Sequence, residues 1–191
     1  HSQTNEAWFT KTPGLKVVYP AFPADAKGLL CSSINDPNPV LFFEHKALYR
    51  SIYQDVSEDY YTIEIGKASL LKEGNDVTII TYGAGVHWAL DTLKTHPNII
   101  ADLIDLRTLQ PLDESAIFTS ARKTGKVIFL QEDSLFGSIS SDVSALITEN
   151  CFEFLDAPVK RVASIETPIP FQGELEKQYL PKQRFAFELK A

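Results

Sequence analysis

The chain has 191 residues, of which 44% are hydrophobic, 23% charged and 11% aromatic, and its formal net charge is −7. A chain of this length buries roughly 70% of the surface that its unfolded form exposes, so we expect one large or two small domains with a real core. The composition excludes a disordered tail, a collagen-like fibre and a disulfide scaffold, and the apolar runs are too short to span a membrane. The 18 basic side chains form no stripe, which disfavours a nucleic-acid-binding surface.

The numbers of methionine, cysteine and charged residues lead to three further expectations. The sequence contains no methionine and begins at His1 without a visible signal peptide, which suggests a piece of a longer chain. Cys31 and Cys151 have neither a CxxC nor a zinc spacing, and they indicate buried free thiols in a reducing compartment. The acidic balance would suit a basic protein partner, although a simply solvated surface explains it as well.

The first fifty residues alternate helix and strand signals. Residues 4–11 are expected to form a helix, and residues 15–20 form a short strand that ends at a proline. Pro23 suits the first turn of a second helix, whose expected buried stripe comprises Ala26, Leu29, Leu30 and Ser33. A turn-rich loop follows, and the apolar run 40–44 predicts a strand covered on both faces.

The pattern weakens between residues 50 and 64, which indicates a linker, and a regular alternation follows it. Strands are expected at 76–82, 101–106, 126–131 and 158–164, with helices between them. Asp113 is the expected cap of one helix and Gly125 its end. This rhythm predicts an α/β domain with a mostly parallel sheet and helices on both faces. Residues 165–191 are expected to pack on this domain or on a partner.

The strands at 15–19 and 40–44 pose a problem, because fifty residues are too few to make a core alone. Both strands would keep unpaired edges. We expect these edges to be covered by another chain or by residues 165–191.

Gly83-Ala84-Gly85 follows an expected strand and opens an expected helix, as in a dinucleotide-binding fingerprint, and Asp105 lies twenty residues beyond. However, Trp88 stands where the fingerprint needs a small third residue. NAD(P) binding is therefore a minor alternative to a tight strand-to-helix turn.

Other candidate groups have weak patterns. The neighbours Glu44-His45 and Glu132-Asp133 end expected strands, but adjacent strand residues point to opposite faces, so solvated strand ends are expected. His87 and His96 show no metal-ligand spacing and are expected to be structural or solvated.

Two further features hold candidate site residues. Ser33, Asp36 and Asn38 offer hard oxygens just after a helix end, where they form either a capping loop or a cation site. If the chain continues upstream, His1 precedes a helix and could act as an acid or base.

Six stretches together resemble the beta subunit of 2-oxo acid dehydrogenase complexes, a transketolase-like family that uses thiamine diphosphate. They are HSQTNEAWF, PGLKVVYPAFPADAKGLL, NPVLFFEHKALYR, EGNDVTIITYGAGVHWAL, IDLRTLQPLD and KTGKVIFLQED, in this order along nearly the whole chain. The LYR ending at residues 48–50 is closer to the branched-chain (2-oxoisovalerate) type than to the pyruvate type.

The resemblance implies that His1 is the catalytic histidine, near the cofactor's thiazolium and the lipoyl group. It implies that Ser33, Asp36 and Asn38 hold potassium. It also implies that the glutamate contacting the cofactor's pyrimidine, and the diphosphate and magnesium site, lie on other parts of the enzyme, so no further cofactor-binding residue is assigned here. The implied organisation is the C-terminal part of the pyrimidine-binding domain at 1–50, a linker at 51–66 and a complete transketolase C-terminal-like domain at 67–191.

The implied function is oxidative decarboxylation of a branched-chain 2-oxo acid with acyl transfer to lipoyl-lysine, by a cytoplasmic or mitochondrial matrix enzyme. The implied partners are an alpha subunit or half, a second beta copy and the acyltransferase core, with no nucleic acid or membrane. The piece alone is expected to be inactive and to serve assembly and docking. A pyruvate or acetoin dehydrogenase, an NAD(P)-binding module and a non-catalytic interaction domain are the alternatives.

Overall fold

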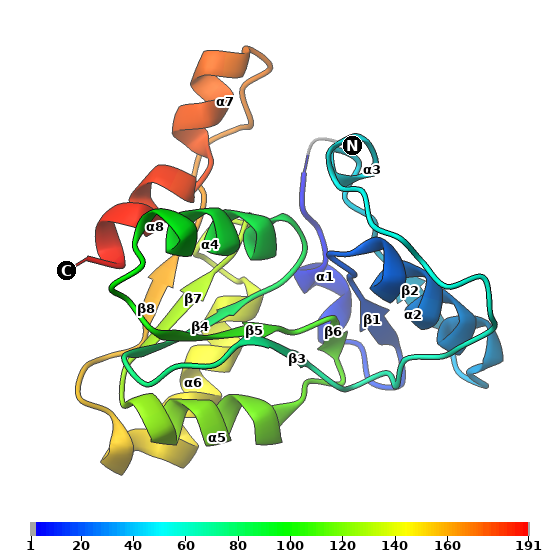
Figure 1. Cartoon of the computed structure of the whole chain (residues 1–191), viewed down its shortest axis with the longest axis horizontal. Coiled ribbons are helices and arrows are strands. Elements are labelled where there is room, and N and C mark those ends of the chain that lie inside the picture. The colour runs from blue at the N-terminus through cyan, green and yellow to red at the C-terminus, as the bar shows by residue number, and fades with distance from the viewer. Residues whose placement is uncertain (1–2, 191) are drawn as a thin grey trace.

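The computed structural model describes residues 3–190, and within this range two sheets divide the molecule into an N-terminal and a C-terminal unit (Figure 1). The first sheet has the strand order β2-β1-β6, formed by Val40–Phe42, Lys16–Val18 and Thr108–Gln110. The second has the order β3-β5-β4-β7-β8, formed by Ser69–Lys72, Ala101–Asp105, Val77–Thr81, Val127–Leu130 and Lys160–Val162.

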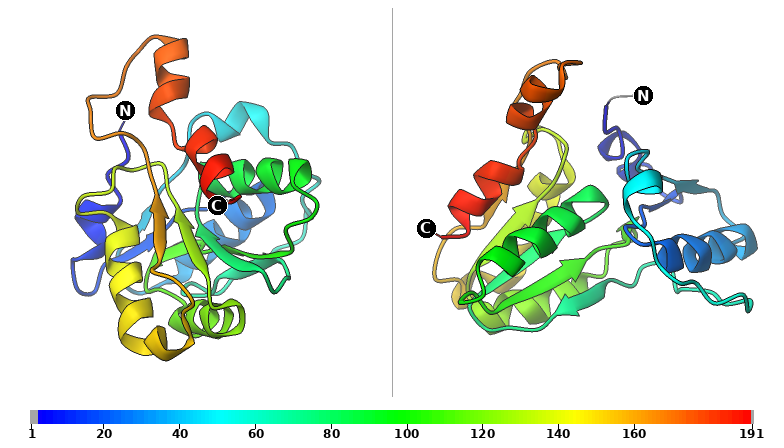
Figure 2. Two further views of the ribbon diagram at one scale, coloured as in Figure 1. Left: turned by 90° about the vertical axis from the view of Figure 1, so that its left-hand side faces the viewer. Right: turned by 45° about the horizontal axis from the view of Figure 1, so that its top comes forward.

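The C-terminal unit is a three-layer α/β domain, as predicted. Strands β5, β4, β7 and β8 run parallel, and β3 joins the edge antiparallel to β5. Helices α4 (Ala84–Thr95) and α8 (Lys182–Glu188) cover one face, and α5 (Glu114–Thr124) and α6 (Ile139–Cys151) cover the other (Figure 2). The sequence did not predict β3, because Ser69–Lys72 has only four residues and its two leucines are adjacent, so it shows no apolar–polar alternation.

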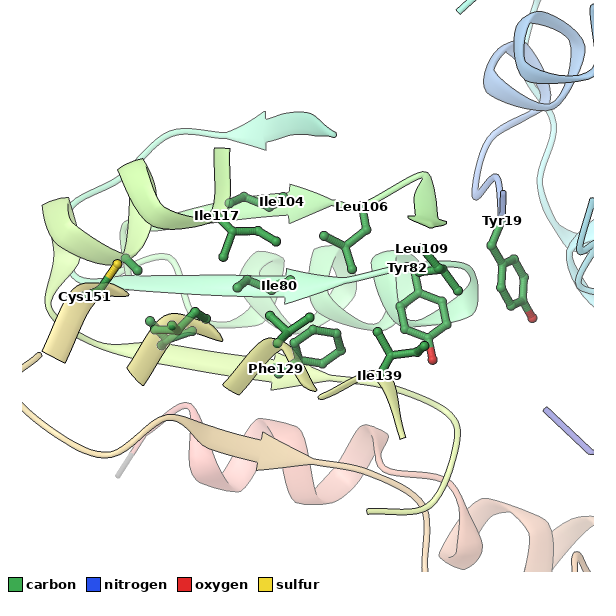
Figure 3. Close-up of a cluster of buried hydrophobic side chains, with 14 of the residues drawn as sticks. Tyr19, Ile80, Tyr82, Ile104, Leu106, Leu109, Ile117, Phe129, Ile139 and Cys151 are labelled. Atoms are coloured by element: carbon green, nitrogen blue, oxygen red, sulfur yellow. The ribbon is translucent and has the colours of Figure 1, made fainter. Parts of the chain in front are cut away.

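The core of this unit lies on both faces of the sheet. Figure 3 shows the larger cluster, in which Phe129 and Ile80 meet Ile117 of α5 and Ile139 of α6. The opposite cluster joins the sheet to α4 and to Phe185 of α8, which is fully buried. Because both faces are covered, β4 is buried along its whole length.

Helix α5 has the ends that the sequence predicted. The Asp113 carboxylate accepts a hydrogen bond from the backbone N–H of Ala116, which satisfies one free donor of the first turn. Gly125 ends the helix with φ +67°, a conformation that suits a residue without a Cβ.

The N-terminal unit contains α1 (Ala7–Thr10), α2 (Pro23–Asn35) and α3 (Leu48–Ser51) around the parallel pair β1 and β2. Helix α2 starts at Pro23, as predicted. However, it buries Asp25, Gly28 and Leu29, while Leu30 is 46% exposed, so the predicted stripe is wrong at Leu30. The reason is the segment after α3, which crosses α2 and donates the Ile63 N–H to the Gly28 carbonyl.

The edge of β1 is covered by the C-terminal unit itself. Residues 108–110 form β6, which pairs antiparallel with β1. The expectation that another chain or residues 165–191 cover β1 was therefore wrong. Strand β2 pairs with β1 alone in the described part of the chain, and its residues are half-buried. The prediction that β2 is covered on both faces was also wrong, because each of its three residues remains partly exposed.

The last segment behaves in two ways. Helix α8 packs on the C-terminal unit as expected, while α7 (Gly173–Tyr179) extends away from it (Figure 1). A short 3-10 helix, η1 (Phe152–Phe154), follows α6. Cys151 is buried and Cys31 half-buried, and both are free thiols. Between residues 3 and 190, no helix has the length and apolar character needed to cross a membrane.

Candidate functional site

Acidic and aromatic side chains from both units meet where β4 and β7 end. Glu6, just before α1, is fully buried, and the Tyr82 hydroxyl donates a hydrogen bond to its Oε1 at 2.6 Å. Its other oxygen, Oε2, has no hydrogen-bond partner among the described residues. Burial raises the pKa of Glu6 to about 7, although the Tyr82 hydrogen bond acts in the opposite direction. Glu6 therefore titrates near neutral pH.

Two tyrosines make the aromatic part of this site. The ring centroids of Tyr19, which follows β1, and Tyr82, which follows β4, lie 5.5 Å apart, and both rings are labelled in Figure 3. Tyr19 also stacks on Phe43, with centroids 5.8 Å apart. Burial raises the pKa of both tyrosines, and the nearby Glu6 raises it further. Both hydroxyls therefore stay protonated and can act as hydrogen-bond donors.

An ion pair links the two units beside these tyrosines. His45 Nε2 lies 2.8 Å from Glu132 Oε2. Burial acts to lower the pKa of His45, but the Glu132 carboxylate outweighs it and the net shift is upward. The prediction of solvated strand ends was therefore wrong for both side chains, since each is the other's partner across the interface.

Asp133 is the third carboxylate of the site. Burial raises its pKa, although the Ser134 N–H and the Thr4 hydroxyl hydrogen-bond to it and act to lower it. We call the set Glu6, Tyr19, His45, Tyr82, Glu132 and Asp133 the interface cluster. It lies at the carboxyl end of the parallel sheet, where open α/β sheets carry their functional groups.

The glycine turn after β4 serves packing. Gly83 has φ +55°, and a Cβ there would lie 2.9 Å from the Tyr19 ring. A Cβ on Gly85 would collide with the Thr81 hydroxyl oxygen. Asp105 is fully buried and accepts a hydrogen bond from the Arg107 N–H, so its carboxylate does not face a ribose site. The geometry favours the tight turn over the NAD(P) alternative.

The structure brings Ser33, Asp36 and Asn38 together at the end of α2. The Ser33 hydroxyl donates to the Leu29 carbonyl, and the Asp36 carboxylate accepts from both nitrogens of Asn38. Asp36 also forms an ion pair with Lys16, which holds the pKa of this carboxyl below its usual range. The Ser33 hydroxyl and the Asp36 carboxylate thus already have partners, and the backbone carbonyls at the helix end remain as potential cation ligands.

The remaining histidines differ in what can be said of them. His1 lies outside the described residues, so the structure does not place it. His87 Nε2 lies 2.8 Å from the Ala21 carbonyl, and His96 Nδ1 lies 2.8 Å from the Thr92 carbonyl, so both are structural as expected. Among residues 3–190, no group of three or more His, Cys, Asp or Glu side chains could hold a metal ion.

The sequence reasoning missed Glu6, Tyr19 and Tyr82 as site residues. Each stands in a stretch that carries the resemblance, but none has a partner at a recognisable spacing. Glu6 and Tyr82 are 76 residues apart, and only the docking of the two units brings them together. The one local signal was position, because Tyr19 and Tyr82 each follow the carboxyl end of a strand, where α/β sheets carry functional groups.

Comparison with known proteins agrees with the two-unit architecture. The family model for the transketolase C-terminal domain matches residues 66–184, and the model for the transketolase pyrimidine binding domain matches residues 1–51. A solved split-gene transketolase, described as an inactive beta4 tetramer, is 26% identical with a TM-score of 0.79 and covers 97% of this chain and 59% of its own.

Three Bacillus subtilis proteins are more similar in sequence. The 2-oxoisovalerate dehydrogenase subunit beta is 49% identical, covering 94% of this chain and 56% of its own. The acetoin:2,6-dichlorophenolindophenol oxidoreductase subunit beta is 48% identical, covering 95% and 53%. The pyruvate dehydrogenase E1 component subunit beta is 45% identical, covering 98% and 58%.

This chain thus spans somewhat more than half the length of these relatives. The matched C-terminal domain covers more than half of the chain itself, and the described fold agrees with it. The chain therefore belongs to the transketolase family, with a C-terminal domain preceded by sequence of the pyrimidine-binding domain.

Proposed function

We propose that this chain is the C-terminal part of the beta subunit, or of the beta half of a fused chain, of a thiamine diphosphate-dependent 2-oxo acid dehydrogenase. The observation that carries the proposal is identity of 45–49% to three beta subunits along 94–98% of the chain. In this proposal residues 1–50 complete a pyrimidine-binding domain, and residues 67–191 form the C-terminal domain. Residues 51–66 are the linker between the two domains.

The proposed substrate is the branched-chain 2-oxo acid 2-oxoisovalerate, whose acyl group passes to a lipoyl-lysine. The LYR ending at residues 48–50 and the 49% identity to a 2-oxoisovalerate dehydrogenase subunit support this choice. Pyruvate and acetoin are the competing substrates, because the corresponding relatives are 45% and 48% identical.

The interface cluster fits only one side of a thiamine diphosphate. Its carboxyls and tyrosines can wall the site and donate hydrogen bonds, but carboxylates repel the diphosphate group, which prefers cationic partners. The diphosphate and magnesium therefore fall to other parts of the enzyme in this proposal. When bound, the cofactor supplies the electron sink for decarboxylation.

His1 is the proposed catalytic residue of this chain, transferring protons during decarboxylation or acyl transfer. The described residues supply its support, since α1 begins six positions later and Glu6 fixes that part of the segment to Tyr82. In the active enzyme, His1→Ala should lower kcat about a hundredfold or more, because acid–base catalysts typically contribute about a hundredfold to ten-thousandfold.

The loop at Ser33, Asp36 and Asn38 is the proposed potassium site. Because the Ser33 hydroxyl and the Asp36 carboxylate already have partners, carbonyls at the end of α2 would supply most ligands. A higher melting temperature in potassium than in equal concentrations of sodium and of choline supports this site, and equal melting temperatures contradict it.

The proposed partners are an alpha subunit or half, a second beta copy and the lipoyl acyltransferase core. A small basic domain of that core would dock on the C-terminal unit, and the net charge of −7 is compatible with such a partner. Pull-down of the core's isolated basic domain by the assembled protein tests this contact, and its salt dependence tests the electrostatic part.

The decisive experiment assays the full assembled protein with thiamine diphosphate, magnesium and a lipoyl acceptor. We expect the highest kcat/KM with 2-oxoisovalerate, a lower value with pyruvate and the lowest with acetoin. Preference for pyruvate or acetoin overturns the branched-chain assignment, and the absence of turnover with all three overturns the proposed function. The 191 residues alone should be inactive, so turnover of 2-oxoisovalerate by the isolated chain would contradict the expected division of the site.

A further inference from the structure

The N-terminal segment touches the C-terminal unit through few polar contacts. Glu6 accepts the Tyr82 hydroxyl at 2.6 Å, and Thr4 hydrogen-bonds to Asp133. Helix α1 has only four residues and no side-chain cap, so it has little stability of its own. Its apolar contacts come from Ala7 and Phe9, which are partly buried against the larger core cluster, and the Phe9 ring lies 6.0 Å from that of Phe43 in the N-terminal unit itself. Glu6 is the only fully buried residue of segment 3–10 and also bonds to the C-terminal unit, so its charge state bears directly on how the segment is held.

We propose that Glu6 is a proton-controlled positioning residue, whose neutral form holds the segment 3–10 on Tyr82 of the C-terminal unit and whose ionised form releases it. The segment leads back to His1, so an effect of its release on catalysis rests on the proposed function. The release of the segment from Tyr82 does not depend on that function. Glu6 acts through the position of the segment and need not touch a substrate.

The surroundings of Glu6 make its charged form costly. It is fully buried, and Oε2 has no hydrogen-bond partner among residues 3–190. The groups that face it are Tyr82 after β4, Tyr19 after β1, Glu132 and Asp133 after β7, and His45 after β2. Two of these are carboxylates, and His45, the cation among them in the part of the chain that the structure describes, is already paired with Glu132. A carboxylate at Glu6 would thus be buried beside like charges.

The direction of the pH effect follows from the two states of the segment. In the closed state burial raises the pKa of Glu6 from 4.5 to about 7, and in the open, solvated state the usual value returns. Closure is therefore most favourable below about pH 4.5 and weakens as the pH rises to about 7. Above about pH 7 Glu6 is ionised in both states, so its titration no longer changes the opening equilibrium.

Hydrogen exchange in the full assembled protein measures this equilibrium directly. After correction for the intrinsic exchange rate, protection of the backbone amides of residues 6–10 should fall about a hundredfold between about pH 5 and about pH 7.5. Amides of β4 should show no comparable fall. Equal protection of residues 6–10 at the two pH values overturns the proposal.

Two substitutions separate proton control from simple packing. Glu6→Gln keeps an oxygen that accepts from Tyr82 but cannot ionise, so protection of residues 6–10 should become independent of pH. The exposed Glu64→Gln is the matched control and should keep the wild-type fall. Tyr82→Phe removes the donor and should lower protection at both pH values. A wild-type pH dependence in Glu6→Gln overturns the proposal.

Kinetics test the catalytic consequence separately. In the active enzyme, kcat of the wild type should fall between about pH 5 and about pH 7.5 relative to kcat of Glu6→Gln, with KM for the 2-oxo acid unchanged. If the exchange results hold but no 2-oxo acid is turned over, the proposed function fails and the proton-controlled segment stands. Identical pH profiles of kcat overturn the link between this segment and catalysis.

Discussion

The two units are stabilised in different ways. In the C-terminal unit, β4 is buried throughout, and apolar clusters cover both faces of its sheet. In the N-terminal unit, β2 is half-buried, and Ile34 on α2 is 75% exposed. Its best-buried strand, β1, has that status because β6 of the C-terminal unit pairs with it.

This contrast implies a hierarchy of folding. The C-terminal unit contains its own core and can form alone, whereas the N-terminal unit takes a strand and several buried contacts from its neighbour. The independently stable C-terminal unit thus supports the N-terminal segment that leads to His1. Positions that join the units should therefore matter to the N-terminal unit more than to the C-terminal one.

Separating the two units should have the largest effect. Residues 66–191 alone should unfold cooperatively, while residues 1–65 alone should lack a stable core, since isolated units of this size usually need additional crosslinks or partners. Thermal melts followed by circular dichroism check both pieces. A cooperative transition of residues 1–65 would show that the N-terminal unit does not depend on its neighbour.

Truncating one core residue should come next. Phe129 on β7 is fully buried in the larger core cluster, which α5 and α6 cover, so Phe129→Ala should lower the free energy of unfolding by about 3–5 kcal/mol. Ile34→Ala, at a 75% exposed position of α2, is the control and should cost less than about 0.5 kcal/mol. Chemical denaturation of the full chain measures both, and similar losses at the two positions would remove the contrast between the units.

The C-terminal unit was predictable because its signals are local. Periodic apolar residues mark its parallel strands, and Asp113 and Gly125 mark the ends of α5. Strand β6 was missed because Thr108–Gln110 is short and pairs with a strand about 90 residues earlier in the sequence, which no local pattern encodes. The exposure of Leu30 was missed for a similar reason. The segment that packs on α2 covers the helix at Gly28 and leaves Leu30 exposed, and this segment comes from another part of the chain.

Disrupting a buried polar network in the C-terminal unit should lower the free energy of unfolding by an intermediate amount. Asp102 on β5 is 1% exposed and accepts hydrogen bonds from Lys123 at 2.6 Å, from Ser120 and from the Gly74 N–H. Asp102→Asn keeps the volume but removes the charge beside Lys123, and should cost about 2 kcal/mol. Lys123→Met with Asp102→Asn should cost less than the two single substitutions added together. Strict additivity would show that the ion pair contributes nothing.

The candidate site was less predictable than the fold. His45 and Glu132 each looked like a solvated strand end, because each was considered with its sequence neighbour. Their true partners come from the other unit, 87 residues away. The Glu6 and Tyr82 pair was hidden in the same way. Where two units meet, single-sequence patterns reveal the groups available but not which of them pair.

The smallest expected effect concerns the ion pair between the units. A double-mutant cycle with His45→Gln and Glu132→Gln should give a coupling energy of about 1 kcal/mol at about pH 6, since the pair is only partly buried. Because Glu132 raises the pKa of His45 in spite of burial, this stabilisation is complete below the usual histidine pKa and is lost as the pH rises through the raised value. The coupling should therefore be near zero at about pH 9. A coupling that does not change between these pH values would mean that the interaction does not depend on the protonation of His45, and that an ion pair does not hold the units together.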